Sequence, residues 1–204
     1  MNITMLSSQK VYRLTNHVLK CVLKRFVVKC SYNLSQKRGT NLIEFVPATI
    51  EDLPFIVQVY NQTIPSRMAT GDVEPVSVED RIPWFKSHNQ QTRPLLVIKV
   101  DNQQAGWVSL NDFYDRDSYR KLAEVSIYIH PDFRGQHVGS QTLDYLDQHV
   151  TDYDIDSVVS LIFGHNQPSL RLFKSHGYEQ WGLLPKIAEM DGNKYDLVIL
   201  GKHF

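Results

Sequence analysis

The stretch Ile127-Tyr-Ile-His-Pro-Asp-Phe-Arg-Gly-Gln-His-Val-Gly-Ser140 runs from the end of an apolar strand through a turn into a helix. The first turn of a helix presents unpaired backbone N–H groups and the positive end of the helix dipole. Glycine lets the backbone approach an anion closely, so the turn suits a pyrophosphate, to which Arg134 would add charge. The same pattern also fits an ordinary strand-to-helix turn in which Gly135 and Gly139 serve only the backbone conformation, because short glycine patterns have low specificity.

The segments on either side of this stretch alternate between strand and helix patterns. Thr49-Ile-Glu-Asp52 and Ser77-Val-Glu-Asp80 have the spacing of capping boxes, and each predicts the start of a helix. The whole pattern predicts one mixed α/β domain without repeats. The predicted helices cover about 49–61, the residues after Ser77, Gly139–Val150 and Pro168–His176, and the predicted strands are Leu42–Val46, Leu95–Val100, Gly106–Leu110, Leu122–His130, Ser157–Phe163, Glu179–Leu184 and Lys194–Leu200.

Composition limits the function classes. The chain has 204 residues, enough for one sizeable core. Its net charge is zero, but residues 44–204 carry 14 basic and 22 acidic side chains, a net charge of −8 that argues against nucleic acid binding. Two cysteines predict no disulfide framework and favour a cytoplasmic location. His130, His165 and His176 lack a convincing ligand set, so no metal site is predicted.

Residues 1–40 form a separate basic extension, which we predict to precede a domain over 41–204. The boundary lies near Ser35–Asn41, where a polar linker pattern occurs, and residues 1–43 contain eight Lys or Arg and no acid. Lys10, Arg13, Lys20 and Lys24 have helical spacing, so the segment could be an amphipathic membrane-surface anchor or a transit-type presequence. A loosely ordered tail, or an extension from a wrongly chosen start codon, explains the same pattern.

The element order, the glycine turn and the later stretch Asn166-Gln-Pro-Ser-Leu-Arg-Leu-Phe-Lys-Ser-His-Gly-Tyr178 together resemble the GNAT superfamily of N-acetyltransferases. That superfamily has an Arg/Gln-x-x-Gly-x-Gly/Ala loop for acyl-CoA after its fourth strand. Several upstream matches are similar to the phosphinothricin acetyltransferase family, in the order Pro47–Thr49, Ile56–Asn61, Ala69-Thr70, Glu74–Ser77, Glu79–Arg81 and Trp84-Phe85. The resemblance covers residues 43 to about 202.

The resemblance implies a GNAT fold, with a mixed central sheet of about seven strands flanked by about four helices. It implies transfer of an acetyl group from acetyl-CoA, without a metal, to the primary amine of a small amino-acid-like acceptor of the phosphinothricin or methionine sulfoximine type. Homodimers are common in the resembled family. The cofactor-binding residues it implies are Ile127, Tyr128 and Ile129 for the pantetheine arm, Arg134, Gly135, Gln136, His137, Val138, Gly139 and Ser140 for the pyrophosphate, and Asn166 and Ser169.

One residue in the loop departs from the family pattern. His137 stands where that pattern has glycine, and its side chain would crowd the turn if the backbone needs a positive φ. The imidazole could contact phosphate, or it could be a solvated loop residue.

Glu124 is the candidate general base. It lies on a strand between apolar residues, which would raise the pKa of its carboxyl group, although a strand glutamate can also face solvent. In the resembled family a glutamate at this motif position is the proposed base. Phe173 occupies the position where the family often has a proton-transferring side chain, and the leaving thiolate would then have to depart without it, which a free thiol pKa of about 8.5 permits.

The sequence identifies the acceptor-binding residues less clearly than the cofactor-binding residues. By resemblance, Tyr119 and Arg120 lie near the substrate, and Arg120 could pair with an acceptor carboxylate. Met68 and Thr70 lie on the loop that borders the acceptor pocket in this fold.

Three other readings of the sequence remain open. His137 and Phe173 favour a CoA-binding sensor or interaction protein that has lost catalysis, whereas Glu124 argues against it. A protein N-terminal acetyltransferase is a second alternative. A membrane-associated protein acting through residues 1–40 is the third.

Overall fold

The computed structural model describes residues 42–204. The predicted extension over 1–40, with its anchor and presequence interpretations, therefore lies outside the described residues. Within 42–204, no helix is long and apolar enough to cross a membrane.

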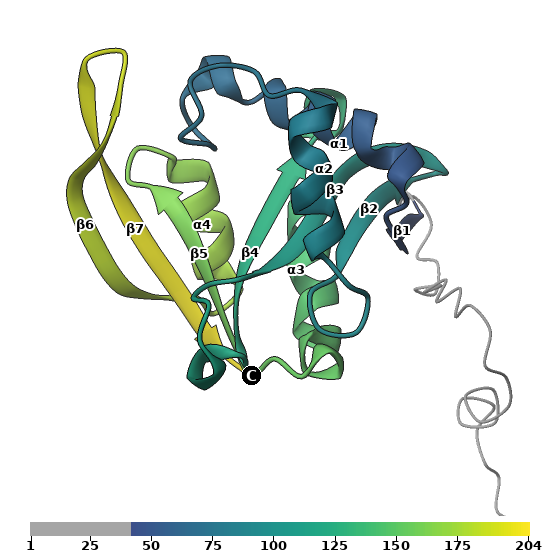
Figure 1. The fold of residues 1–204 in the computed structure, drawn as a ribbon. Coiled ribbons are helices and arrows are strands. Elements are labelled where there is room, and N and C mark those ends of the chain that lie inside the picture. Colours follow the sequence, from purple (N-terminus) through teal and green to yellow (C-terminus); the bar gives the residue numbers. More distant parts are fainter. Residues whose placement is uncertain (1–41) are drawn as a thin grey trace, which may run out of the picture. The chain divides into compact units, whose positions relative to one another are not determined.

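A seven-stranded sheet forms the centre of the domain (Figure 1). Its strand order is β1-β2-β3-β4-β5-β7-β6, and every neighbouring pair is antiparallel except β4 with β5. The predicted mixed sheet with four helices is confirmed. The strands are β1 (Ile43–Pro47), β2 (Leu95–Val100), β3 (Gln103–Asp112), β4 (Leu122–Ile129), β5 (Ser157–Phe163), β6 (Glu179–Met190) and β7 (Asn193–His203).

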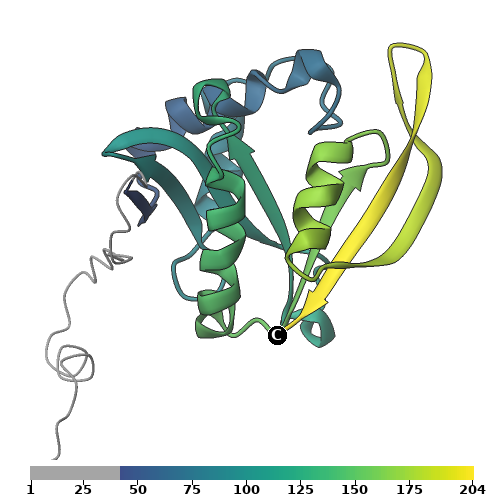
Figure 2. The same cartoon turned by 180° about the vertical axis from the view of Figure 1, so that it is seen from behind.

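Two helices cover each face of the sheet. The helices α1 (Leu53–Asn61) and α2 (Val78–Ser87) lie on one face in Figure 1, and Figure 2 shows α3 (Val138–His149) and α4 (Gln167–Ser175) on the other. Each pair buries its own apolar cluster against the sheet. Leu53 and Ile56 pack with Trp107 on the first face, and Leu143 and Leu170 pack with Val125 on the second. The sheet therefore separates two cores.

Capping explains where the first helices begin. The Ser77 hydroxyl accepts a hydrogen bond from the Asp80 backbone N–H and donates one to the Asp80 carboxylate, which starts α2 as predicted. Thr49 makes the same kind of box with Asp52, but it starts a short 3₁₀ turn (Ile50–Asp52) that leads into α1. Pro54 fits the first turn of α1 because a helix leaves that N–H unpaired.

The parallel strands β4 and β5 separate after a short pairing. Their register runs only from Leu122 opposite Ser157 to Glu124 opposite Val159. Beyond Glu124 the two strands diverge, as Figure 1 shows, while β3 stays paired to the other edge of β4 as far as Ile129. The edge of β4 that faces β5 is therefore free of strand pairing over Val125–Ile129, and this opening positions the site.

Candidate active site

Two cavities lie next to each other along β4. The first, of about 330 Å³, is here called the aromatic cavity and is lined by Ile56, Val57, Tyr60, Arg81, Trp84, Trp107, Asn111, Glu124, Ser126 and Tyr128. The second, of about 390 Å³, is here called the strand cleft and is lined by Met68–Gly71, Glu124–Tyr128, Ser160–Phe163, Asn166, Ser169, Phe173, Ala188 and Leu197. Glu124, Ser126 and Tyr128 line both, because alternate residues of a strand face the same side. A ligand in one cavity can therefore meet a ligand in the other beside these residues.

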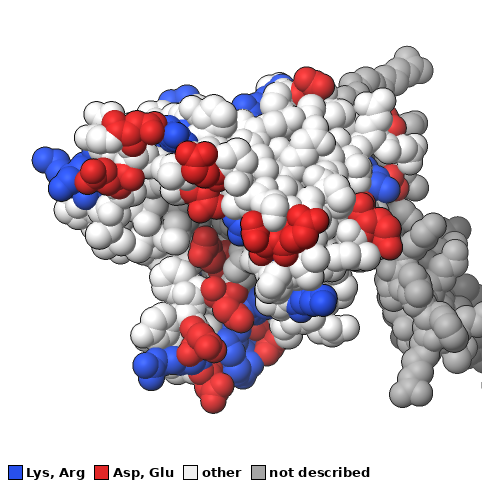
Figure 3. All heavy atoms as spheres, turned by 45° about the horizontal axis from the view of Figure 1, so that its top comes forward, with Lys and Arg blue, Asp and Glu red and all other residues white. Residues whose placement is uncertain are grey.

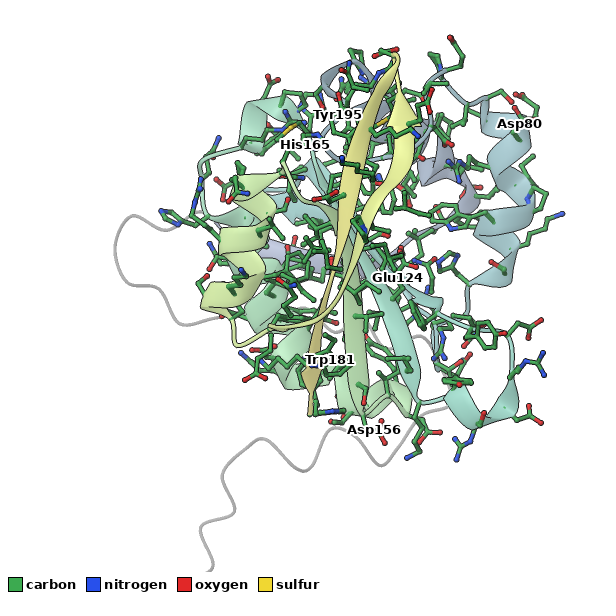
Figure 4. All side chains as sticks on the ribbon, turned by 90° about the vertical axis from the view of Figure 1, so that its left-hand side faces the viewer. Asp80, Glu124, Asp156, His165, Trp181 and Tyr195 are labelled. Carbon is green, nitrogen blue, oxygen red and sulfur yellow. The ribbon has the colours of Figure 1, made fainter. Side chains whose placement is uncertain are left out.

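Glu124 lies at the last paired position of β4, where the strands begin to diverge. Figure 4 shows it near the middle of the sheet, between the level of His165 and Tyr195 and that of Trp181 and Asp156. Burial raises the pKa of its carboxyl group above the ordinary 4.5, because the charged form loses hydration. Its carboxylate has no hydrogen-bond partner among residues 42–204. The group is thus suited to accept a proton from a ligand.

Aromatic rings form most of the wall of the aromatic cavity. Trp107 stacks on Tyr128 with a ring-centroid distance of 4.5 Å, and Trp84 meets Trp107 edge-on at 5.6 Å. The Trp107 indole N–H donates to the backbone oxygen of Ile56 at 3.0 Å, which fixes the ring. Burial raises the pKa of Tyr128, so its hydroxyl stays protonated and donates to Ala69. This wall suits an uncharged group on a small ligand.

The glycine turn after β4 has the geometry of an anion site. Gly135 and His137 both have left-handed backbones, with φ of 75° and 60°, and α3 begins at Val138. A Cβ on Gly139 would stand 3.0 Å from Leu172, so this glycine lets α3 pack closely against α4. The backbone N–H groups of the first turn of α3 are not used within the helix, which leaves them available for a phosphate.

His137 adopts the positive φ for which the family pattern uses glycine. A left-handed conformation costs a residue with a side chain about 1–2 kcal/mol. We expect His137→Gly to raise the free energy of unfolding by up to about 1 kcal/mol, because glycine's own entropic cost of roughly 0.5–1 kcal/mol offsets part of the relief. Denaturant unfolding checks this. His137→Ala is the matched control, since it removes the imidazole and keeps the strained backbone, and an equal gain in that variant would contradict the explanation.

The strand cleft brings the expected pantetheine residues together. Ile127, Tyr128, Asn166 and Ser169 all line it, and the open edge of β4 continues through Ile129. Asn166 caps α4 by accepting from the Ser169 backbone N–H at 3.2 Å, and its side-chain amide also donates to the backbone oxygen of Met68 at 2.9 Å. Asn166 therefore has a structural role whatever else it binds.

Phe173 also lines the strand cleft. Its ring is buried and lies edge-on to Tyr178, with a centroid distance of 4.9 Å. The side chain fills space beside the cleft and offers no proton.

The loop that contains Met68 and Thr70 lies over the strand cleft. Both residues line the cleft and neither lines the aromatic cavity, although the Thr70 hydroxyl contacts that of Tyr60. Arg67 at the start of the loop forms an ion pair with Asp191 at 2.7 Å, and its backbone oxygen contacts the His165 imidazole at 2.8 Å. These contacts join the loop to the β6–β7 hairpin and to the start of α4.

Tyr119 and Arg120 lie away from both cavities. Tyr119 ends a 3₁₀ turn (Asp117–Tyr119) and is exposed, with its ring against Tyr114. The Arg120 guanidinium forms an ion pair with Asp154 at 2.6 Å. Within residues 42–204 the arginine that lines the aromatic cavity is Arg81, on α2.

Sequence reasoning gave no role to Arg81, Trp84 and Asn111. Arg81 and Trp84 are three residues apart on a predicted helix, which places them on one face, and that spacing could have marked them as a pair. Asn111 lies opposite Glu124 on the neighbouring strand, and its side-chain oxygen contacts His88 and accepts from the Trp84 indole N–H. The pairing register of β3 and β4 places Asn111 beside Glu124, and no local sequence pattern predicts that register.

The surface agrees with the charge balance of the domain. Figure 3 shows Asp and Glu side chains running down the middle of one face and at its sides, with Lys and Arg in small separate groups among and around them. No continuous basic patch appears on this face of the described residues. In the same part of the chain, no three metal-ligating side chains come together.

Comparison with known proteins identifies the family. The model of the acetyltransferase (GNAT) family matches residues 56–178. The chain belongs to this family. A Bacillus subtilis protein named "Putative phosphinothricin acetyltransferase YwnH" is 51% identical over 152 residues, which cover 74% of this chain and 93% of that protein. The prediction that the chain is an acetyltransferase of the GNAT type is thereby confirmed.

A solved structure and a second relative extend the comparison. The crystal structure of a "putative phosphinothricin N-acetyltransferase" has a TM-score of 0.76 and 48% identity, and covers 79% of this chain and 98% of its own. An L-methionine sulfoximine/L-methionine sulfone acetyltransferase from Pseudomonas aeruginosa is 28% identical over 154 residues, covering 75% of this GNAT chain and 90% of its own length.

Proposed function

We propose that the chain transfers an acetyl group from acetyl-CoA to the primary amine of a small amino-acid-like acceptor. The observation that carries the proposal is the position of Glu124, which lines the strand cleft and the aromatic cavity at once. The strand cleft takes the acetyl donor and the aromatic cavity takes the acceptor. The names of the relatives support an acceptor of the phosphinothricin or methionine sulfoximine type.

The residues of the chain divide the work of acetyl transfer. The open edge of β4 over Ile127–Ile129 pairs with the pantetheine arm, and the turn from Arg134 to Ser140 holds the pyrophosphate. The pantetheine arm fits because that strand edge is unpaired, and the pyrophosphate fits because the turn has two left-handed residues. Acetyl-CoA, when bound, supplies the acetyl group as a thioester.

Glu124 accepts a proton from the ammonium group of the acceptor, directly or through a water molecule. The freed nitrogen lone pair forms a bond to the thioester carbonyl carbon, and the carbon–sulfur bond breaks to release the thiolate. The nitrogen gives its remaining surplus proton to solvent as the neutral amide forms. Phe173 supplies no proton to that thiolate. The thiolate leaves unprotonated, which a thiol pKa of about 8.5 permits, and solvent protonates it afterwards.

The experiment follows thiol release from acetyl-CoA by the full chain. The acceptors are phosphinothricin, methionine sulfoximine, methionine sulfone and the ordinary amino acids. We expect release with at least one sulfoximine-like acceptor and identification of the N-acetyl product by mass spectrometry. Binding of CoA without release for any acceptor would overturn the proposal and favour the non-catalytic sensor.

We also propose that the chain forms a homodimer through β6, the edge strand of the sheet. Apolar side chains on β6 are exposed, and Ile187 keeps 64% of its surface accessible. Exposed apolar patches on an unpaired sheet edge favour association with another chain. We expect sedimentation to give twice the monomer mass for the wild type and a monomer for Ile187→Glu. A monomeric wild type would contradict this proposal.

Two further predictions concern the cytoplasmic location and a membrane contact through residues 1–40. The first stays a prediction from cysteine usage, and the second falls on residues outside the described part of the chain.

A further inference from the structure

Arg81 is placed to bind a ligand in the aromatic cavity. Its guanidinium carbon lies 4.5 Å from the ring centroid of Tyr60 and 5.9 Å from that of Trp84, and one nitrogen forms an ion pair with Asp72 at 2.9 Å. A guanidinium has five N–H donors. Within residues 42–204 the Asp72 carboxylate is the acceptor that Arg81 uses. The aromatic rings and Asp72 therefore hold the group in place, and donors remain for a ligand.

The cavity has one charged side chain of each sign in its lining. Arg81 is the basic one and Glu124 is the acidic one. An α-amino acid has the matching arrangement, with a carboxylate and an amine on the same carbon. An amine directed at Glu124 for proton transfer leaves the carboxylate to meet Arg81, and planar bidentate pairing with a carboxylate is the contact that arginine makes best.

Two other arginines, Arg93 and Arg120, have carboxylate partners outside the cavity. Arg93 is buried and pairs with Asp112 at 2.6 Å, and Arg120 pairs with Asp154 at 2.6 Å. Neither lines the cavity. The role that the sequence suggested for Arg120 therefore fits Arg81 better.

We propose that Arg81 binds the α-carboxylate of the acceptor, so that the enzyme selects free α-amino acids with an uncharged side chain. This inference rests on the proposed function. The side chain of the acceptor packs on the rings of Trp84, Trp107 and Tyr128, which offer no second positive charge. A sulfur-containing or otherwise uncharged chain packs well on such rings, whereas a second acidic group on the acceptor would be desolvated without a partner.

The test compares methionine sulfone with its α-amide, in which the carboxylate is replaced. A hydrogen bond to a charged group discriminates by about 10- to 100-fold, so the wild type should show a kcat/KM higher for the acid by that factor. Arg81→Gln should lower kcat/KM for the acid about 10- to 100-fold, mainly through KM, and leave the amide nearly unchanged. Arg81→Lys should restore part of the preference. Phosphinothricin, with two acidic groups, should be a poorer acceptor than methionine sulfone.

Asp72→Asn provides the matched control. It removes the charge of the ion pair but keeps a side-chain oxygen that can accept a hydrogen bond from the Arg81 guanidinium, so the preference for the acid should persist. Equal losses for acid and amide in Arg81→Gln, reproduced by Asp72→Asn, would assign Arg81 a structural role and overturn the inference. Equal use of acid and amide by the wild type would also overturn it, with the proposed function intact. No turnover of any acceptor would overturn the proposed function itself.

Discussion

Glu124→Gln is expected to lower kcat for acetyl transfer by about 100- to 10,000-fold, the range that a positioned general base contributes. The substitution keeps the shape of the side chain and removes its capacity to accept a proton. Binding of CoA should change little, because the carboxylate makes no hydrogen bond to residues 42–204 and the phosphate turn lies at the other end of the β4 edge. Steady-state turnover measures kcat, and a CoA titration measures the affinity for CoA separately.

Two comparisons make this result specific. Glu179→Gln removes a carboxylate from the exposed start of β6 and should leave kcat unchanged. The wild-type kcat/KM should fall as the pH falls through the pKa of Glu124, which burial places above 4.5, because the protonated carboxyl cannot act as a base. The glutamine variant should lack that acidic limb. An unchanged rate and the same limb in Glu124→Gln would exclude this residue as the base.

Gly106→Ala is expected to destabilise the domain by about 1–3 kcal/mol or more, in the range of overpacked core substitutions. Gly106 lies opposite Ile129 in the β3–β4 pairing. A Cβ at this position would overlap the backbone oxygen of Tyr128 and stand 3.1 Å from the Ile129 Cα. Backbone atoms cannot rotate away as a side chain can, so β3 and β4 must move apart at the segment expected to pair with pantetheine. Denaturant unfolding and CoA titration should both show a loss.

Gly182→Ala is the control for that result. The new Cβ would meet only side-chain atoms of Ile199, at 3.3 Å, and a side chain can adjust by a few tenths of an ångström. We expect a clearly smaller loss of stability and no change in CoA affinity. Wild-type stability in Gly106→Ala would mean that the two strands are less closely held than the register indicates.

Local signals predicted most of the framework. The capping box at Ser77 marked the start of α2, and the apolar run Ser157–Phe163 was found with its bounds. The β6–β7 hairpin is longer than the sequence predicts, since β6 extends to Met190 and β7 spans Asn193–His203. Its outer part contains Lys186 with a positive φ and a register shift between Leu184 and Ala188, and its side chains are largely exposed. A strand with these irregularities has no alternating apolar pattern to reveal it.

The site residues also fall into two groups, those that a local sequence pattern marks and those that only tertiary packing brings together. Glu124 and the turn from Arg134 to Ser140 belong to one continuous stretch of sequence, so a motif could point to them. The aromatic cavity is assembled from α1, α2, β3 and β4, and Arg81 reaches it only after α2 packs on the sheet. The partner of Arg120 is Asp154, 34 residues further along the chain, and no local pattern predicts that pairing. Tertiary packing therefore decides which arginine serves the acceptor.

A crystal structure of the full chain with acetyl-CoA tests the central claim most directly. The account predicts that the pantetheine arm lies between β4 and β5 along Ile127–Ile129, that the pyrophosphate lies on the turn before α3, and that the thioester ends beside Glu124 with its carbonyl open to the aromatic cavity. A thioester on the far side of β4, or one separated from Glu124 by protein, would contradict it.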